Sequence, residues 1–247
     1  YPRNLAADLA IAKQHHVAAV FMPTLADMYP TLPSLAACSE LKTMSVERDA
    51  KHFKAIKPWA KYDFNYLLAP EILALKMDGK LHPWFFDGVA TVVSRLFDCV
   101  QPHHAFFGEK DPQQLAILKQ LAQRQHPDVT VLGVPTIRDR DGVAASSRNT
   151  LLNKTQRHKV ATVAAHLASV ATQLKQSTQT LDEILKERYQ TISTIEGITI
   201  DFLQGVNPLS LEPLNAESQD ALLYLAYFIE GIRLTDERYI SLKTISE

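Results

Sequence analysis

One short segment, residues 106–115, combines residue types that suit phosphate binding; it reads Phe-Phe-Gly-Glu-Lys-Asp-Pro-Gln-Gln-Leu. A strand ending at Gly108 would let a ligand approach the backbone because glycine has no side chain, and Pro112 favours the first turn of a helix. The free N–H groups at a helix start attract anions, and Lys110 adds a full positive charge. The segment therefore predicts a phosphate site at a strand-to-helix junction.

The same junction also has a purely structural interpretation. Asp111 is a good N-cap residue, and Gln114, three residues later, would complete a capping box with it. Spacing alone leaves both interpretations open.

A second segment, residues 135–149, contains a turn at Asp141-Gly142 followed by Ser146, Ser147 and Arg148. Two hydroxyl groups beside a planar, permanently charged guanidinium suit a polyphosphate. The alternative is a solvated, serine-rich linker that leads into the next helix. Neither segment matches a Walker loop or the dinucleotide G-x-G-x-x-G pattern, so P-loop chemistry is not expected.

Charge and composition exclude several other classes of protein. The 247 residues carry 26 basic and 27 acidic side chains, a net charge of −1, so nothing favours nucleic acid as a partner. No run approaches the roughly 20 apolar residues that a membrane span needs. Cys38 and Cys99 are too few for a disulfide framework and have apolar neighbours, so we expect core residues and a reducing, cytoplasmic compartment. The nine histidines form no cluster at ligand spacing, so no metal site is predicted.

Hydrophobic periodicity in the first 150 residues predicts alternating helices and strands. We expect helices at 5–14, 89–100 and 115–121, and short buried strands at 18–22, 105–107 and 129–134. Such an alternation indicates an α/β fold with a parallel sheet covered on both faces. Residues 33–61 show only a weak pattern and predict no defined element.

The pattern changes after residue 150. Two helices, 155–176 and 181–189, precede strands at 198–203, 222–229 and 232–242, with a tight turn at Glu230-Gly231. This order predicts a small antiparallel sheet packed on helices. We therefore expect two domains, residues 1–150 and 151–247.

Taken together, the two phosphate-type segments resemble the pantothenate synthetase family. The match consists of Gly-Glu-Lys-Asp-x-Gln-Gln-Leu at 108–115 and Asp-Gly-x-Ala-x-Ser-Ser-Arg-Asn at 141–149. It extends over nearly the whole chain, through Tyr1-Pro2-Arg3, Tyr29-Pro30, residues 88–93, Gln101-Pro102 and Ile232-Arg233-Leu234. The resemblance implies a Rossmann-like parallel sheet of the nucleotidyltransferase type, incomplete at its N-terminus, and a smaller C-terminal α+β lid.

The resemblance also implies an activity. Members of this family condense pantoate with β-alanine at the expense of ATP: the carboxylate of pantoate forms pantoyl adenylate and pyrophosphate, and the amine of β-alanine then displaces AMP. No residue acts as a covalent nucleophile, and Mg²⁺ assists. The expected partners are therefore these small molecules and a second subunit in a homodimer.

Family roles transfer to matching positions of this chain. Lys110, Ser146, Ser147 and Arg148 would carry the catalytic charge stabilisation, and Gln114 would hydrogen-bond pantoate, a role that competes with the capping box. The implied ATP-binding residues are Gly108, Glu109, Lys110, Asp111, Ile137, Ala145, Ser146, Ser147 and Arg148.

Three departures from the family pattern affect these expectations. The ATP-binding Pro-Thr-Met-Gly and His-x-Gly-His motifs, and a second pantoate-binding glutamine, would precede residue 1, so we expect residues 1–247 alone to be inactive. Residues 82–86 read His-Pro-Trp-Phe-Phe where the family usually has Arg-Pro-Gly-His-Phe, and residues 33–61 resemble an insertion. Two alternatives therefore stay open: an impaired homologue serving as a binding or oligomerisation module, and a ligase that adenylates another small acid.

Overall fold

The structure is a computed structural model that describes residues 4–29, 73, 76–81 and 85–242. The chain forms two compact units, residues 1–66 and 67–247. No helix in the described part of the chain has the length and apolarity needed to span a bilayer. Residues 33–61, with their predicted insertion, and Cys38 lie outside the described residues.

The described residues of the first unit form two helices. Helix α1 (Leu5–Gln14) has the predicted bounds, and α2 (Leu25–Met28) begins with a capping box between Thr24 and Asp27. The strand predicted at 18–22 is wrong, because these residues have no strand conformation. A strand requires hydrogen bonds to a neighbour, and the described residues of this unit offer none.

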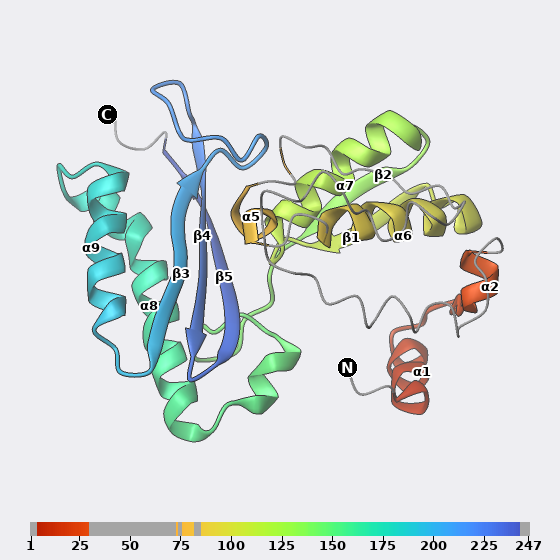
Figure 1. Ribbon diagram of the computed structural model, residues 1–247, viewed down its shortest axis with the longest axis horizontal. Helices are drawn as coiled ribbons and strands as arrows, with labels where there is room; N and C mark the ends of the chain where they lie inside the picture. Colours follow the sequence, from red (N-terminus) through yellow and green to blue (C-terminus); the bar gives the residue numbers. More distant parts are fainter. Residues whose placement is uncertain (1–3, 30–72, 74–75, 82–84, 243–247) are drawn as a thin grey trace, which may run out of the picture. The chain divides into compact units, whose positions relative to one another are not determined.

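The second unit begins with a parallel β-α-β arrangement (Figure 1). Strands β1 (His104–Gly108) and β2 (Thr130–Val134) pair in parallel, from His104↔Thr130 to Gly108↔Val134. Three helices accompany them: α5 (Met77–Leu81), α6 (Phe85–Val100) and α7 (Pro112–Gln125). The predicted helix and strand positions are confirmed here. The predicted coverage of both sheet faces is not met within this unit, since Phe106 exposes 66% of its surface.

The C-terminal part of this unit is an antiparallel sheet of order β3-β4-β5 beside two helices (Figure 1). The predicted turn Glu230-Gly231 joins β4 to β5, and both residues have positive φ angles, 47° and 87°. Glycine adopts such angles without strain, which suits a two-residue hairpin loop. The elements are η1 (Ser147–Leu151), α8 (Lys154–Gln176), α9 (Leu181–Ser193), β3 (Ile198–Val206), β4 (Asp220–Ile229) and β5 (Ile232–Ser241).

Strand β4 contributes to two hydrophobic cores. Its Leu222 and Tyr224 belong to the core built on α6, α7 and β2, whereas Leu223 and Leu225 belong to the core under α8 and α9. Successive side chains of a strand point to opposite faces, so a strand buried on both faces reads as a continuous apolar run. This explains why residues 222–229 lack the alternation of a half-exposed strand.

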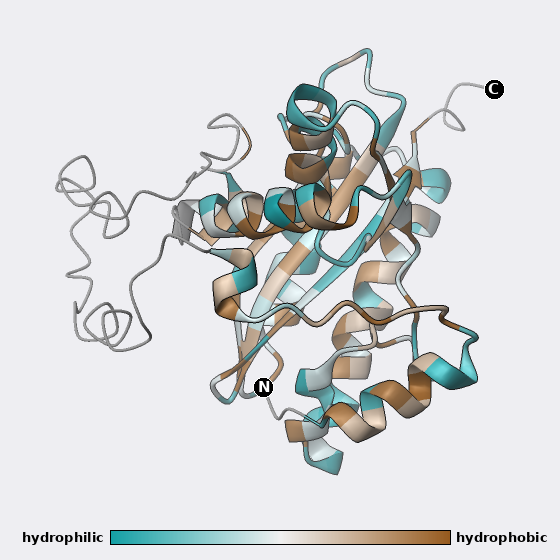
Figure 2. Ribbon diagram, turned by 90° about the vertical axis from the view of Figure 1, so that its right-hand side faces the viewer, coloured by the Kyte–Doolittle hydropathy of each residue, from teal (hydrophilic) through white to brown (hydrophobic). Residues whose placement is uncertain are grey.

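Unlike β4, the helices are not apolar throughout: hydrophobic and hydrophilic stretches alternate along their length (Figure 2). The predicted apolar stripe of α8 is buried, namely Val160, Val163, Leu167, Val170 and Leu174. One expectation about this part of the chain is wrong: Cys99 is exposed at the end of α6 rather than buried in the core. The predicted boundary between domains 1–150 and 151–247 stays a prediction.

Candidate functional site

The predicted strand-to-helix junction is present. Strand β1 ends at Gly108, the backbone N–H of Glu109 donates to the carbonyl of Val134 at 2.9 Å, and α7 begins at Pro112. A Cβ atom at Gly108 would meet no heavy atom within 4 Å, so the backbone faces open space at this point. The junction therefore offers the access that a phosphate group would need.

Asp111 occupies the predicted N-cap position at this junction, but the predicted capping box between Asp111 and Gln114 is wrong. Asp111 is the N-cap residue of α7, but its side chain makes no capping hydrogen bond. Its ψ angle is 72°, whereas Thr180, which does form a capping box at α9, has a ψ of 159°. An extended backbone aims the side chain at the first helical turn. Neither Asp111 nor the half-buried Gln114 is therefore committed to a cap.

Charges from both predicted segments meet at Asp111. Burial raises the pKa of Asp111, the positive charges of Lys110 and Arg148 act to lower it, and Asp78 acts to raise it further. Lys110 belongs to the first segment and Arg148 to the second. The fold thus brings Lys110 and Arg148, which are 38 positions apart in the sequence, into one electrostatic environment.

A small crevice of about 10 Å³ is shared by the two segments. Lys110, Ser146 and Asn149 line it, together with Asp236 on β5. This volume is at the lower limit of the space, roughly 10–15 Å³, that a cavity needs to hold one water molecule. The crevice is therefore small, with room for about one water molecule.

The remaining predicted residues lie around this crevice without lining it. The backbone N–H of Arg148 donates to Ser146 Oγ at 3.2 Å, and Arg148 Nη1 donates to the carbonyl of Arg233 at 3.0 Å. Ser147 starts η1, two residues after Ala145, and Ile137 exposes 72% of its surface. The predicted phosphate-binding groups therefore cluster, but the hydroxyl of Ser146 and the guanidinium of Arg148 are engaged by neighbouring backbone.

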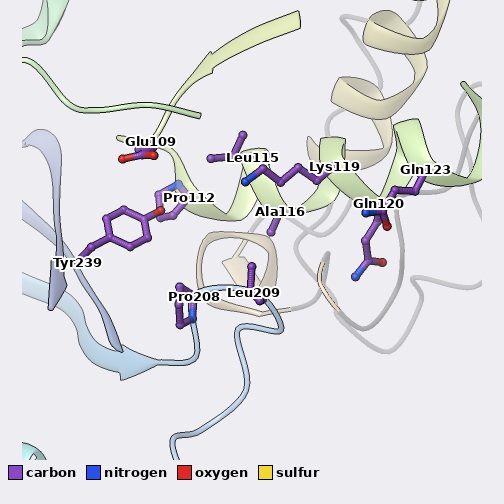
Figure 3. A pocket seen from close by; sticks show the side chains of 10 residues that line it. All are labelled: Glu109, Pro112, Leu115, Ala116, Lys119, Gln120, Gln123, Pro208, Leu209 and Tyr239. Atoms are coloured by element: carbon purple, nitrogen blue, oxygen red, sulfur yellow. The ribbon is translucent and has the colours of Figure 1, made fainter. Parts of the chain in front are cut away.

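A larger cavity of about 320 Å³ lies beside the junction (Figure 3). Glu109 and Tyr239 line one end of it, and Lys119 extends along α7. Burial raises the pKa of Tyr239, and the negative charge of Glu109 raises it further. The other lining residues are Pro112, Leu115, Ala116, Gln120, Gln123, Pro208 and Leu209.

Gly133 on β2 provides the room that Glu109 occupies. A Cβ at Gly133 would lie 2.7 Å from Glu109 Oε1 and 3.0 Å from Leu115 Cδ2, closer than carbon atoms pack. We expect Gly133→Ala to cost about 1–3 kcal/mol of unfolding free energy through overpacking. Chemical denaturation measures this cost, and Gly108→Ala, whose Cβ meets open space, is the matched control that should fold normally. Equal stability of the two variants would contradict the expected collision.

Several polar residues at the site were not predicted. Asp78 on α5 accepts hydrogen bonds from Tyr224 Oη and Arg233 Nη2, both at 2.5 Å, and Arg233 Nη2 also donates to Asp201 at 2.8 Å. Of these residues, only Arg233 belongs to a segment that resembles the family, Ile232-Arg233-Leu234, and the resemblance implied no role for it. Residues 155 positions apart carry no sequence signal of their contact.

Arg157 holds the tip of the loop that precedes Ser146. Its Nη2 donates to Asp141 Oδ1 at 2.6 Å and to Asp139 Oδ2 at 2.8 Å. The hydrogen bond from Arg157 lowers the pKa of Asp141. A lowered folded-state pKa adds stability above the unfolded pKa of about 3.9, and this stability is lost as pH falls through the folded value.

We therefore expect Arg157→Gln to cost at most about 1 kcal/mol at neutral pH, since the pair is partly exposed. The difference from wild type should vanish on acidification through the lowered pKa of Asp141. Urea unfolding of both proteins at a series of pH values measures it. A difference that persists when Asp141 is protonated would contradict this origin.

Ser94, His126 and Asp98 form a chain that resembles a nucleophilic triad. Ser94 Oγ lies 2.6 Å from His126 Nε2, and Asp98 Oδ1 lies 3.8 Å from His126 Nδ1. Ser94 is buried between α6 and α7, and neither cavity described above includes it. The chain is therefore a link between the two helices.

These features define an α/β protein in which a strand-to-helix junction on a parallel sheet shares a crevice with a loop that leads into an antiparallel α+β part. The sequence pattern of the family described as Pantoate-beta-alanine ligase matches residues 1–239. The chain belongs to this family, which confirms the resemblance and the predicted α/β fold class.

Individual relatives agree with this assignment. The chain is 34% identical over 240 residues to a pantothenate synthetase from Corynebacterium glutamicum, covering 96% of this chain and 74% of the relative. A pantothenate synthetase from Trichlorobacter lovleyi is 33% identical over 236 residues, covering 96% and 72%.

Solved structures give the same result. The pantothenate synthetase from Thermus thermophilus superposes with a TM-score of 0.77 at 30% identity, covering 96% of this chain and 75% of that one. The pantoate-beta-alanine ligase from Francisella tularensis, complexed with beta-gamma ATP and beta-alanine, gives a TM-score of 0.63 at 25% identity, covering 96% and 70%.

Proposed function

We propose that this protein condenses pantoate with β-alanine at the expense of ATP, through a pantoyl-adenylate intermediate. The observation that carries the proposal is the shared crevice of Lys110 and Ser146 in a chain of this family. A cation and a hydroxyl from two separate segments, with Arg148 close by, are the groups that a nucleotide's phosphate tail requires.

Each predicted residue then has a stated role. Lys110 and Arg148 neutralise charge on the phosphates, and the hydroxyl groups of Ser146 and Ser147 donate to phosphate oxygens. Gln114, free of the capping box, hydrogen-bonds pantoate. Gly108, Glu109, Asp111, Ile137 and Ala145 complete the nucleotide site, with Gly108 and Ile137 acting through the backbone.

The reaction proceeds in two substitutions. A carboxylate oxygen of pantoate attacks the α-phosphorus of ATP, and the bond to the bridging oxygen breaks to release pyrophosphate. The amine of β-alanine then attacks the acyl carbon, AMP leaves, and a proton is released from the new amide nitrogen. The protein contributes positioning and charge neutralisation rather than a covalent intermediate.

The size of the crevice adds a point to this proposal. A triphosphate is much larger than about 10 Å³, so ATP would lie across the crevice and its surroundings rather than inside it. Arg148, whose guanidinium donates to the carbonyl of Arg233, would exchange that contact for phosphate oxygens. We therefore propose that the Arg148 side chain turns towards the nucleotide when ATP binds.

Mg²⁺ is the proposed counter-ion of ATP. Such an ion needs only one or two protein carboxylates, because substrate phosphates and water supply its other ligands. Asp111 offers one carboxylate beside Lys110 and Arg148. When bound, the ion neutralises charge that develops on the phosphates.

A homodimer is the proposed assembly, and light scattering of the full-length protein tests it.

The expectation that residues 1–247 alone are inactive stays a prediction and is supported by no feature of the fold. Of the departure at 82–86, residues 82–84 lie outside the described residues, and Phe86, which matches the phenylalanine of the family, is buried in the core. Phe85 replaces the histidine of the family and exposes 52% of its surface, so the impaired homologue stays an alternative that an activity assay decides.

A coupled assay tests the proposed function directly. The full-length protein with ATP, Mg²⁺ and pantoate should release AMP only when β-alanine is added. Other small hydroxy acids replace pantoate in parallel reactions, and a faster reaction with one of them would transfer the assignment to a related ligase. Absence of β-alanine-dependent AMP release would refute the proposal.

A further inference from the structure

The loop that carries Ser146 and Arg148 is continuous with a short hairpin, residues 137–145. The N–H of Ala145 donates to the carbonyl of Ile137 at 2.8 Å, and the N–H of Asp139 donates to the carbonyl of Val143 at 2.9 Å. Because Ser146 follows the hairpin directly, the position of the hairpin sets the position of the loop.

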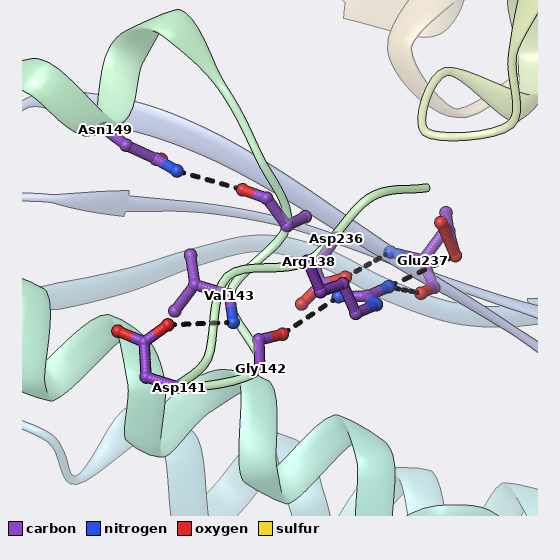
Figure 4. Close-up of polar contacts among 8 residues, drawn as sticks. Arg138, Asp141, Gly142, Val143, Asn149, Asp236 and Glu237 are labelled. Carbon is purple, nitrogen blue, oxygen red and sulfur yellow. Dashed lines mark hydrogen bonds and ion pairs between the residues drawn. The ribbon is translucent and has the colours of Figure 1, made fainter. Parts of the chain in front are cut away.

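Arg138 connects this hairpin to strand β5 (Figure 4). Its Nη1 donates to Asp236 Oδ1 at 2.8 Å and to the carbonyl of Gly142 at 3.2 Å, and its Nη2 donates to the carbonyl of Glu237 at 2.6 Å. The guanidinium is a rigid planar fork, so contacts in several directions fix its place and orientation. One side chain therefore ties the turn of the hairpin to the sheet.

The partners of Arg138 are buried. Asp236 and Glu237 each expose only 4% of their surface. Buried carboxylates are tolerated when they are paired and hydrogen-bonded, and Arg138 supplies this pairing for Asp236. The arginine consequently cannot shift far without weakening the pairing of these buried carboxylates, to which the charge of Arg238 also contributes.

Asp236 also lines the crevice that Lys110 shares with Ser146. The pair thus lies where the two phosphate-type segments meet. We propose that the buried ion pair between Arg138 and Asp236 positions the Ser146–Arg148 loop opposite Lys110, and so sets the affinity for the phosphates of a nucleotide. Both are positioning residues, and this inference rests on the proposed function.

The test separates positioning from general stability by comparing Michaelis constants. Arg138→Lys keeps the charge but loses the fork, and we expect the KM for ATP to rise about 10- to 100-fold, the usual scale for misplaced binding groups. The KM for β-alanine should stay near the wild-type value. Calorimetric titration with ATP alone provides the same comparison without turnover.

Arg188→Lys is the matched control. Arg188 lies on α9 with 14% of its side chain exposed, against 19% for Arg138, and it bonds to Gln173 away from the crevice. We expect this variant to lower the melting temperature while leaving the KM for ATP unchanged. A rise in the KM for ATP that is equal in both variants, or absent in folded Arg138→Lys, overturns the inference.

A double variant covers the case in which Arg138→Lys does not fold. Arg138→Met with Asp236→Leu removes both charges together, and such replacements commonly preserve folding. We expect it to fold and to bind ATP weakly; folding with wild-type affinity overturns the inference. If the wild-type protein itself binds no ATP, the proposed function fails and the inference fails with it.

Discussion

Replacing Lys110 with alanine should weaken ATP binding by about 1.5–3 kcal/mol, roughly 10- to 150-fold, because a hydrogen bond to a charged group is lost. Lys110 is the cation of the strand-to-helix junction, and it lines the crevice with Ser146. Isothermal titration of the full-length protein with ATP, in the presence and absence of pantoate, measures the change.

The control for this variant is Lys119→Ala. Lys119 lies on α7, the helix that begins just after Lys110, and lines the larger cavity instead of the crevice. We expect its ATP affinity to match the wild type, which separates a specific phosphate contact from the loss of one positive charge. An unchanged affinity after Lys110→Ala would remove the basis for the proposed nucleotide site.

Replacing Arg233 with leucine should destabilise the protein by about 3 kcal/mol, the lower end of the range for breaking a buried ion pair. Its guanidinium bonds to Asp78 and Asp201, whose side chains are each 18% exposed, and the variant would leave both carboxylates without this cation. Chemical denaturation gives the free energy of unfolding.

Lys159→Met is the matched control for Arg233→Leu. Lys159 is 18% exposed, similar to the 21% of Arg233, but its partner Glu196 is 94% exposed. Water solvates an exposed partner, so we expect a cost of at most about 1 kcal/mol. If both variants lost the same stability, the bonds from Arg233 to Asp78 and Asp201 could not be the cause.

The strand end and the helix start at the candidate site were predicted correctly from the sequence, the capping box was not, and the roles of the site residues stay predictions. Gly108, Lys110 and Pro112 lie where the pattern placed them, because a strand end and a helix start depend on neighbouring residues. The capping box at Asp111 did not form, since the backbone there has a ψ of 72°. Spacing between side chains does not reveal such a backbone angle.

Elements, their order and the family could be derived from the sequence alone. Helices α6 to α9 and strands β1 to β5 follow from periodicity, which depends on residues a few positions apart. Partners across the fold were decided only by tertiary structure. Arg138 meets Asp236 over 98 positions, and Arg233 meets Asp78 over 155. These pairs form because packing of β4 and β5 against both cores brings them within bonding distance and removes them from water. The order of charged residues along the sequence shows neither which residues come close together nor which are removed from water.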